Sequence, residues 1–203
     1  MTEEEARTWL RDRHGEERLL LLERYVAALL TENASQNLIS KASEVHIWVR
    51  HILDSAQLAL FAPDADTWLD IGSGAGLPGL VIAALTERPM LLVEPRRKRA
   101  EFLTNMVEHL VLKNVLVRQS EVEKVLGNTF SAVTARAFAP LPQLFSSTVQ
   151  LTDSSTIWIL PKGRSAEREL AEASNSWQGV FHVEQSLTDE NARIIVATDV
   201  RRG

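Results

Sequence analysis

The residues best suited to hold a ligand form a glycine-rich segment, residues 68–79 (WLDIGSGAGLPG). Gly72, Gly74, Gly76 and Gly79 stand between two short apolar runs. Glycine adopts positive φ angles and lets a ligand approach the bare backbone, and a helix that starts behind such a loop offers unpaired N–H groups. An ordinary turn from strand to helix needs one glycine, so four glycines within eight residues predict a binding loop.

Two ligands could use this loop. The GxGxxG stretch at 74–79 matches the dinucleotide fingerprint, and Glu94 follows twenty residues after its first glycine, where a ribose-binding acid is expected. The other alignment, DxGxGxG at 70–76, is the pattern of S-adenosylmethionine-dependent methyltransferases. In that alignment Asp70 anchors the loop or faces the methionine ammonium, and Glu94 bridges the ribose hydroxyls.

The elements that must position this loop change type along the chain. Apolar residues recur at three- and four-residue steps in residues 16–33 and 43–61, which predicts helices, and a polar turn at 63–66 closes this part. From residue 67 onward, short apolar runs alternate with helical stretches, which predicts an α/β domain with a mainly parallel sheet. The expected strands are 67–71, 90–93, 115–117, 131–134 and 156–160, and the expected helices are 79–86, 96–110, 122–126 and 142–151. We therefore expect a helical extension over residues 1–62, packed on a domain over residues 63–203.

The end of the chain differs from this alternation. Strand patterns at 180–185 and 192–197 are separated by a short polar connection that leaves no room for a helix. The two form an expected hairpin, so one strand runs antiparallel at or near the sheet edge. A doubly wound sheet that ends in an antiparallel strand is typical of methyltransferases, and this favours the second alignment of the glycine loop.

Composition narrows the class of protein. The 203 residues are 45% hydrophobic and 24% charged, which indicates a globular chain with a core. No apolar run is long enough for a membrane span and the N-terminus is acidic, so we expect a cytoplasmic protein with no membrane partner. The absence of cysteine excludes thiolate metal ligands and cysteine nucleophiles, and the histidines show no metal spacing. The net charge of −5 argues against a protein that coats nucleic acid non-specifically. We expect a monomer without a metal.

Several short segments together resemble a known family. They are Asn37-Leu38, RHILDS at 50–55, DIGSGAGLPG at 70–79, RAF at 136–138 and Lys162-Gly163, in this order over residues 37–163. The chain thereby resembles the bacterial 16S ribosomal RNA methyltransferase G family, also called glucose-inhibited division protein B. The resemblance implies a class I, Rossmann-like methyltransferase fold with S-adenosylmethionine as cofactor. It also implies methylation of N7 in one guanosine of 16S rRNA, as free RNA or in the small ribosomal subunit.

The resemblance also implies site residues. It places Gly72 and Leu77 in the cofactor loop, Val122 and Glu123 after the third strand, and Arg136 after the fourth. The carboxylate of Glu123 can accept a hydrogen bond from the exocyclic amine of adenine. The alternative is that Glu123 is an ordinary solvent-exposed acid without a ligand. Arg136 can pair with the cofactor carboxylate or a phosphate, or form a structural ion pair. With Asp70, Gly74 and Glu94 these residues complete the expected cofactor site.

Basic residues outside that site are candidates for RNA contacts. Arg50 and Asp54, four apart on one predicted helix, could simply pair with each other, and His51 and Ser55 form a second polar pair. The basic block 96–99 opens a predicted helix, where cations oppose the helix dipole unless Glu94, Glu101 or RNA phosphate offsets them. The residues expected to contact RNA are Arg50, His51, Arg96, Arg97, Lys98 and Lys162.

The expected chemistry needs no catalytic acid or base. Guanine N7 carries its own lone pair and can attack the sulfonium methyl in line, so catalysis consists mostly of positioning and electrostatics. Three alternatives stay open at this point: a nicotinamide-dependent oxidoreductase, a non-catalytic RNA-binding protein of ribosome assembly, and a methyltransferase of small molecules.

Overall fold

The computed structural model describes residues 1–127 and 129–203. One sheet has the strand order β3-β2-β1-β4-β5-β7-β6. Its strands are β1 (Trp68–Ile71), β2 (Met90–Val93), β3 (Val115–Arg118), β4 (Ala132–Ala135), β5 (Ile157–Lys162), β6 (Trp177–Gln185) and β7 (Arg193–Arg202). The first five strands run parallel, and β7 is antiparallel to both β5 and β6. The predicted α/β class with a terminal antiparallel hairpin is confirmed.

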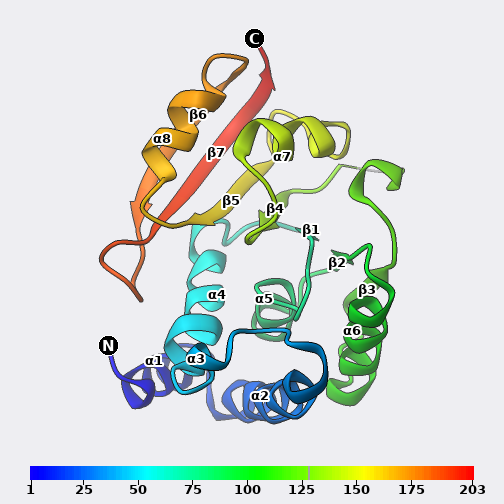
Figure 1. Cartoon of the computed structure of the whole chain (residues 1–203), viewed down its shortest axis with the longest axis vertical. Helices are drawn as coiled ribbons and strands as arrows, with labels where there is room; N and C mark the ends of the chain where they lie inside the picture. Colours follow the sequence, from blue (N-terminus) through cyan, green and yellow to red (C-terminus); the bar gives the residue numbers. More distant parts are fainter. Residues whose placement is uncertain (128) are drawn as a thin grey trace.

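Helices cover both faces of this sheet (Figure 1). The N-terminal part holds α1 (Glu3–His14), α2 (Glu16–Gln36), α3 (Lys41–Glu44), the π-helix η1 (Trp48–Leu53), α4 (Asp54–Ala56) and the 3₁₀-helix η2 (Gln57–Phe61). The rest holds α5 (Gly79–Thr86), α6 (Arg97–Leu110), η3 (Val122–Lys124), α7 (Leu141–Thr148), η4 (Val149–Leu151) and α8 (Ala166–Ala173). In Figure 1 the N-terminal helices, α5 and α6 lie below the sheet, α7 lies above it, and α8 lies at the upper left beside β6 and β7.

Two apolar clusters match these two faces. Side chains alternate along a strand, so Trp68 joins the N-terminal helices, α5 and α6, whereas Leu69 and Ile71 join α7 and α8. Because every residue of β1 and β2 is buried, β2 reads in the sequence as a short continuous apolar run, and β1 reads as an apolar run interrupted only by Asp70. The sheet is therefore a rigid platform for the loops at its strand ends.

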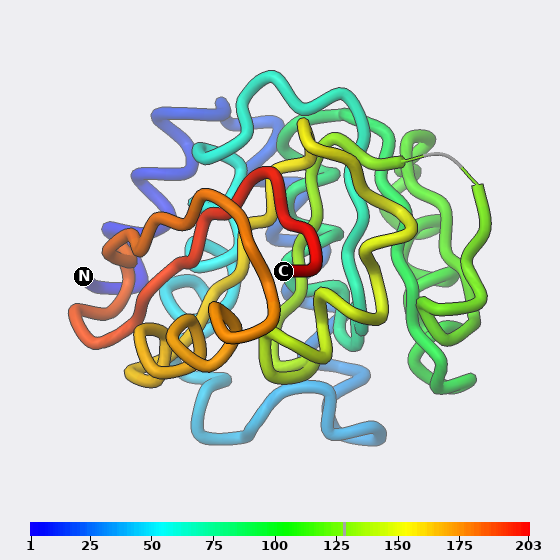
Figure 2. The backbone as a smooth tube through the Cα atoms, turned by 90° about the horizontal axis from the view of Figure 1, so that it is seen from above, coloured from blue at the N-terminus to red at the C-terminus, as the bar shows by residue number. Residues whose placement is uncertain are grey.

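The N-terminal helices belong to the first of these clusters. Tyr25 and Leu29 of α2 are buried in it, and the Tyr25 hydroxyl donates a hydrogen bond of 2.8 Å to the carbonyl oxygen of Ala75. The N-terminal extension thus reaches the glycine loop from below. Figure 2 shows that the N-terminus and the β6–β7 turn lie on the same side of the molecule, and Met1 and residues 187–192 line one pocket.

Some elements differ from the prediction. The single helix expected at 43–61 is divided into α3, η1, α4 and η2, and the helix expected at 122–126 is one 3₁₀ turn. A helical hydrophobic pattern does not distinguish α from π or 3₁₀ geometry. Helix α8 was not predicted because its buried side chains are only Ala166 and Ala173, which leave little apolar signal in the sequence.

Candidate functional site

The glycine loop turns from β1 into α5 by backbone hydrogen bonds to the next strand. Gly72, Gly74 and Gly76 have φ angles of 66°, 55° and 90°. The amides of Gly72 and Ser73 donate to the carbonyl of Val93 at 2.8 and 3.2 Å. A side chain at Gly79 would clash, since its Cβ would lie 2.3 Å from Leu92 Cδ2. That glycine lets α5 start directly on β2, so the third glycine of GxGxxG is explained by packing.

Asp70 holds this turn from below. It is fully buried, and its Oδ1 accepts a hydrogen bond of 2.9 Å from Thr134 Oγ1 while its Oδ2 accepts one of 3.3 Å from the Gly79 amide. Burial raises the pKa of Asp70 to about 6, against these hydrogen bonds and the charge of Arg136, which lower it. Of the two roles expected for Asp70, the structure supports the anchor.

Glu94 performs a similar task at the end of β2. Its Oε2 accepts a hydrogen bond of 2.9 Å from the Gly74 amide, and its Oε1 accepts one of 2.8 Å from the Arg96 amide. The side chain is buried, with 3% of its surface exposed. Both oxygens keep a lone pair beyond these bonds. Glu94 thus fixes the loop, and its contact with a ribose stays a prediction.

A pocket of about 390 Å³ opens beside the loop. We call it the loop pocket; its lining residues are Ile71, Gly72, Val93, Pro95, Glu121, Val122, Glu123 and Phe138. It brings together three of the predicted cofactor residues, Gly72, Val122 and Glu123, which are far apart in the sequence. Apolar walls together with the carboxylates of Glu121 and Glu123 suit a flat heteroaromatic ring that carries an amine. Leu77 is buried in the core beneath the loop.

Arg136 follows β4 and lies in a cluster with two side chains of the N-terminal part. Its Nη1 is 3.2 Å from His51 Nδ1 and 4.0 Å from Asp54 Oδ2. His51 Nε2 is 2.9 Å from Ser43 Oγ. Burial, and then the charges of Arg136 and Arg50, lower the pKa of His51 to about 4, so the ring is neutral and can accept from the guanidinium. Asp54 pairs with Arg136 and not with Arg50, the alternative that the sequence offered, and the Ser55 hydroxyl is buried without a hydrogen bond to His51.

Arg136 also lines a second pocket of about 650 Å³ at the ends of β4 and β5. We call it the β4–β5 pocket; its lining residues are Asp54, Arg136, Ala137, Phe138, Ala139, Pro140, Pro161, Lys162, Gly163, Arg168, Glu169 and Glu172. Lys162 Nζ donates to Glu169 Oε2 at 2.8 Å and to the Ala139 carbonyl at 3.2 Å. Lys162 therefore has partners within the chain, and its contact with RNA stays a prediction.

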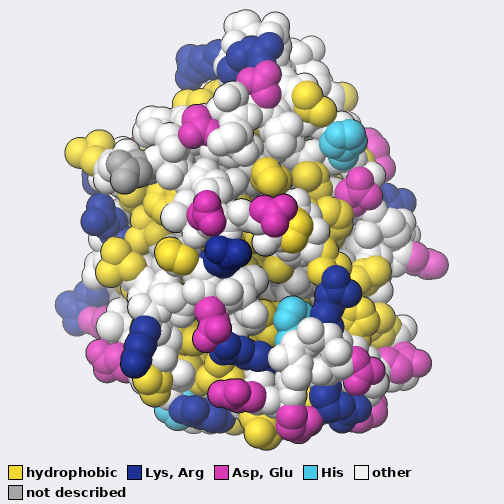
Figure 3. Space-filling view, turned by 180° about the vertical axis from the view of Figure 1, so that it is seen from behind, with side chains coloured by type: hydrophobic (Ala, Val, Ile, Leu, Met, Phe, Trp, Pro, Cys, Tyr) yellow, Lys and Arg dark blue, Asp and Glu magenta, His cyan; other side chains and the backbone are white. Residues whose placement is uncertain are grey.

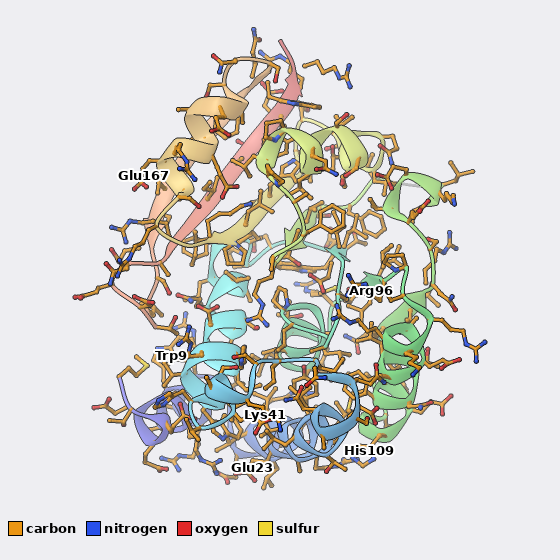
Figure 4. The ribbon with its side chains drawn as sticks, in the orientation of Figure 1. Trp9, Glu23, Lys41, Arg96, His109 and Glu167 are labelled. Carbon is orange, nitrogen blue, oxygen red and sulfur yellow. The ribbon has the colours of Figure 1, made fainter. Side chains whose placement is uncertain are left out.

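The other basic candidates lie at two separate places. Arg96, Arg97 and Lys98 are exposed at the start of α6, and Figure 4 shows Arg96 beside the loop that follows β1. Arg97 Nε lies 2.9 Å from Glu101 Oε1, so Glu101 offsets part of the charge at this helix start. Arg50 lines another pocket with the β6–β7 turn.

Two residues near the loop were not assigned from the sequence. Phe138 lines both the loop pocket and the β4–β5 pocket. Arg99 Nη1 lies 3.6 Å from the position that a Cβ on Gly74 would take. Both belong to stretches quoted for other reasons, RAF and the basic block, but only the fold shows that they reach the glycine loop.

The strand order and the glycine loop define the class I methyltransferase fold. One similar structure is that of MtNAS in complex with S-adenosylmethionine, with a TM-score of 0.63 and 19% identity over 97% of this chain and 83% of that chain. Another is an S-adenosylmethionine-dependent methyltransferase from Aquifex aeolicus, with a TM-score of 0.62 and 14% identity over 78% of this chain and 95% of that one. Both likenesses concern the fold.

The sequence comparisons identify the family. The model of the GidB family, described as rRNA small subunit methyltransferase G, matches residues 18–195. The ribosomal RNA small subunit methyltransferase G of Erythrobacter litoralis is 48% identical over 96% of this chain and 95% of its own length. That of Sphingopyxis alaskensis is 48% identical over 97% of this chain and 86% of its own. The chain belongs to the rRNA small subunit methyltransferase G family. The predicted family and enzyme class, an S-adenosylmethionine-dependent rRNA methyltransferase, are thereby confirmed.

The described part of the chain holds neither a cluster of metal ligands nor a membrane-spanning helix. Among residues 1–127 and 129–203, the structure contains no group of three or more His, Asp or Glu side chains arranged to hold a metal ion. Within the same ranges, none of the helices combines the length and apolar character of a membrane span.

Proposed function

We propose that the protein transfers the methyl group of S-adenosylmethionine to N7 of a guanosine in 16S rRNA. Family membership supports the reaction class and the RNA, and the geometry of the two pockets supports the place. The observation that carries the proposal is the loop pocket, which joins Gly72, Val122 and Glu123 directly beside the β4–β5 pocket. A methyl donor in the first pocket and an acceptor in the second would meet at their common wall.

The residues present fit an adenosine in the loop pocket. Val93 and Val122 offer apolar walls for the ring, and the Glu123 carboxylate can accept from the exocyclic amine. Gly74 carries no side chain, so the rest of the cofactor can approach its backbone, and Glu94 accepts a hydrogen bond from its amide. When bound, the cofactor supplies an electrophilic methyl group. Arg136 offers its guanidinium as a charge partner for a carboxylate from the side of the β4–β5 pocket.

The reaction as proposed asks the protein for position rather than for proton transfer. N7 has no proton to lose, so no side chain need act as a general base. Consistent with this, His51 is engaged on both nitrogens by Arg136 and Ser43. Asp70 is engaged by Thr134 and Gly79.

The test is methyl transfer to RNA of known modification state. Purified protein with radiolabelled S-adenosylmethionine is incubated with 16S rRNA and, separately, with small subunits, both from a strain that lacks this enzyme. We expect one N7-methylguanosine per RNA, mapped by chain cleavage at that base. Background methylation of both substrates would overturn the proposal.

The dinucleotide alignment makes a different prediction. A nicotinamide enzyme would bind NAD tightly and S-adenosylhomocysteine weakly, whereas the proposed function requires the reverse. Calorimetric titration with both ligands separates the two. We also propose that the protein acts as a cytoplasmic monomer, which sedimentation of the purified protein tests in part.

A further inference from the structure

We infer that the β4–β5 pocket receives the acceptor purine, and that Phe138 is the aromatic surface on which this base stacks. The inference rests on the proposed function, because it names the place and the platform of the acceptor in that reaction. Phe138 lies between the two pockets and lines both of them.

Phe138 is the wall that the two pockets share. It lines the loop pocket together with Gly72, and the β4–β5 pocket together with Arg136. Its ring lies against the glycine loop, since a Cβ on Gly72 would lie 2.8 Å from Phe138 Cδ2. A base stacked on this ring would lie next to the cofactor loop, as methyl transfer requires.

The backbone directs Phe138 to this place. Ala137 has a φ of 51°, in the left-handed region that residues other than glycine rarely adopt. The chain therefore turns sharply between Arg136, which faces His51 and Asp54, and Phe138, which faces Gly72. Such strain persists where the surrounding structure holds it, and it is common at functional sites.

The remaining walls suit a flat, polar-edged base. Pro140 and Pro161 add apolar surface, and the ion pair of Lys162 and Glu169 stands at a polar end. Phe138 keeps 38% of its surface exposed, although a large apolar side chain gains by burial. Stacking of a nucleic-acid base would cover that surface, and it is the usual way in which proteins hold an unpaired base.

The test uses size-matched changes of the ring. Phe138→Leu keeps an apolar side chain without an aromatic face, Phe138→Tyr keeps the face, and Phe181→Leu on β6 is the control outside both pockets. We measure single-turnover methyl transfer to small subunits at saturating cofactor, and S-adenosylhomocysteine affinity by titration. Loss of one base–aromatic stack corresponds to roughly a five- to hundredfold effect. Phe138→Leu should lose about tenfold or more in the rate of methyl transfer or in RNA affinity, while its affinity for S-adenosylhomocysteine stays within about twofold of the parent. Phe138→Tyr and Phe181→Leu should keep most of the methyl-transfer rate.

Two results would overturn the inference. In one, Phe138→Leu methylates as fast as the parent and binds RNA as tightly. In the other, its cofactor affinity falls as much as its rate, which would make Phe138 a wall of the cofactor site alone. The parent protein is assayed first, before any variant. If it methylates no RNA, the result contradicts the proposed function itself rather than the role of Phe138.

Discussion

Asp70 and Glu94 are buried carboxylates at the ends of neighbouring strands, and each holds the glycine loop with one oxygen and a second segment of the chain with the other. The sequence predicted a role for both from the motif, because Asp70 precedes the glycines and Glu94 follows twenty residues after Gly74. It could not show which partners they take, since Thr134 reaches Asp70, and the Gly74 amide reaches Glu94, only through the fold. The same holds for Phe138, whose contact with Gly72 depends on the turn at Ala137.

Gly74→Val should weaken S-adenosylhomocysteine binding at least tenfold. A Cβ there would already contact Arg99 Nη1 and the carbonyl oxygen of Gly72, both at 3.6 Å, so the branched side chain would crowd the loop and oppose a φ of 55°. Gly15→Val is a matched control, because Gly15 has a φ of 87° with open space around it, far from the loop in α1–α2. Calorimetric titration should show parental affinity for the control. Equal loss in both variants would mean that backbone strain, rather than the site, explains the effect.

His51→Gln should reduce the loss of stability at acid pH. The pKa of His51 is lowered from 6.5 to about 4 in the fold, so between these values the unfolded chain binds more protons and stability falls as pH falls. The partly exposed position reduces this contribution to roughly 1–2 kcal/mol. Asp70, with its pKa raised to about 6, acts in the opposite direction, and Asp54 also has a raised pKa. The measurement is therefore the difference between parent and variant in urea unfolding from pH 7.5 to 4.5. Parallel curves would contradict the prediction.

At the scale of elements, burial decided how well the sequence predicted the fold. The bounds expected for β2 and α5 are those observed, Met90–Val93 and Gly79–Thr86, because both segments are apolar throughout and end at polar residues or proline. The stretch from 43 to 61 was predicted as one helix, but it changes geometry three times, and its hydrogen bonds to the C-terminal hairpin join residues about 130 positions apart. No local pattern reports such a contact.

Those hydrogen bonds fasten the β6–β7 turn to the N-terminal helices, and removing them should loosen the turn. Gln57 is buried, accepts from the Leu187 amide at 2.8 Å and donates to Ser186 Oγ at 3.0 Å. Gln57→Leu would leave buried polar groups unpaired and cost about 2–3 kcal/mol of unfolding free energy. Gln185→Leu, which loses contacts only within the turn, is the control and should cost less than about 1 kcal/mol. Chemical denaturation gives both values, and amide hydrogen exchange should become faster at residues 186–192 in Gln57→Leu alone.

At the scale of the whole molecule, the surface has no large patch of one charge on the face shown in Figure 3. On the face shown in Figure 3, basic and acidic side chains are interspersed, in keeping with the net charge of −5. Such a surface gives RNA no general attraction, so binding must rely on local contacts and on shape. The sequence predicted this limit from composition alone, but it could not tell which basic residues are already paired within the chain, as Lys162 is with Glu169.

Replacing Arg96, Arg97 and Lys98 together by Gln should flatten the salt dependence of RNA binding. The three are exposed at the start of α6, and the exposed Arg97–Glu101 pair is weak enough to yield to a phosphate. Each phosphate contact contributes roughly 0.7–0.9 to the slope of log affinity against log salt, so the triple change should lower the slope by about two. The control replaces the exposed Arg11, Arg13 and Lys113 by Gln, which removes the same charge elsewhere. Filter binding of small subunits over a range of salt gives each slope. If the control flattens the slope equally, overall charge governs binding; if neither does, the RNA surface lies around Arg50 and the β4–β5 pocket.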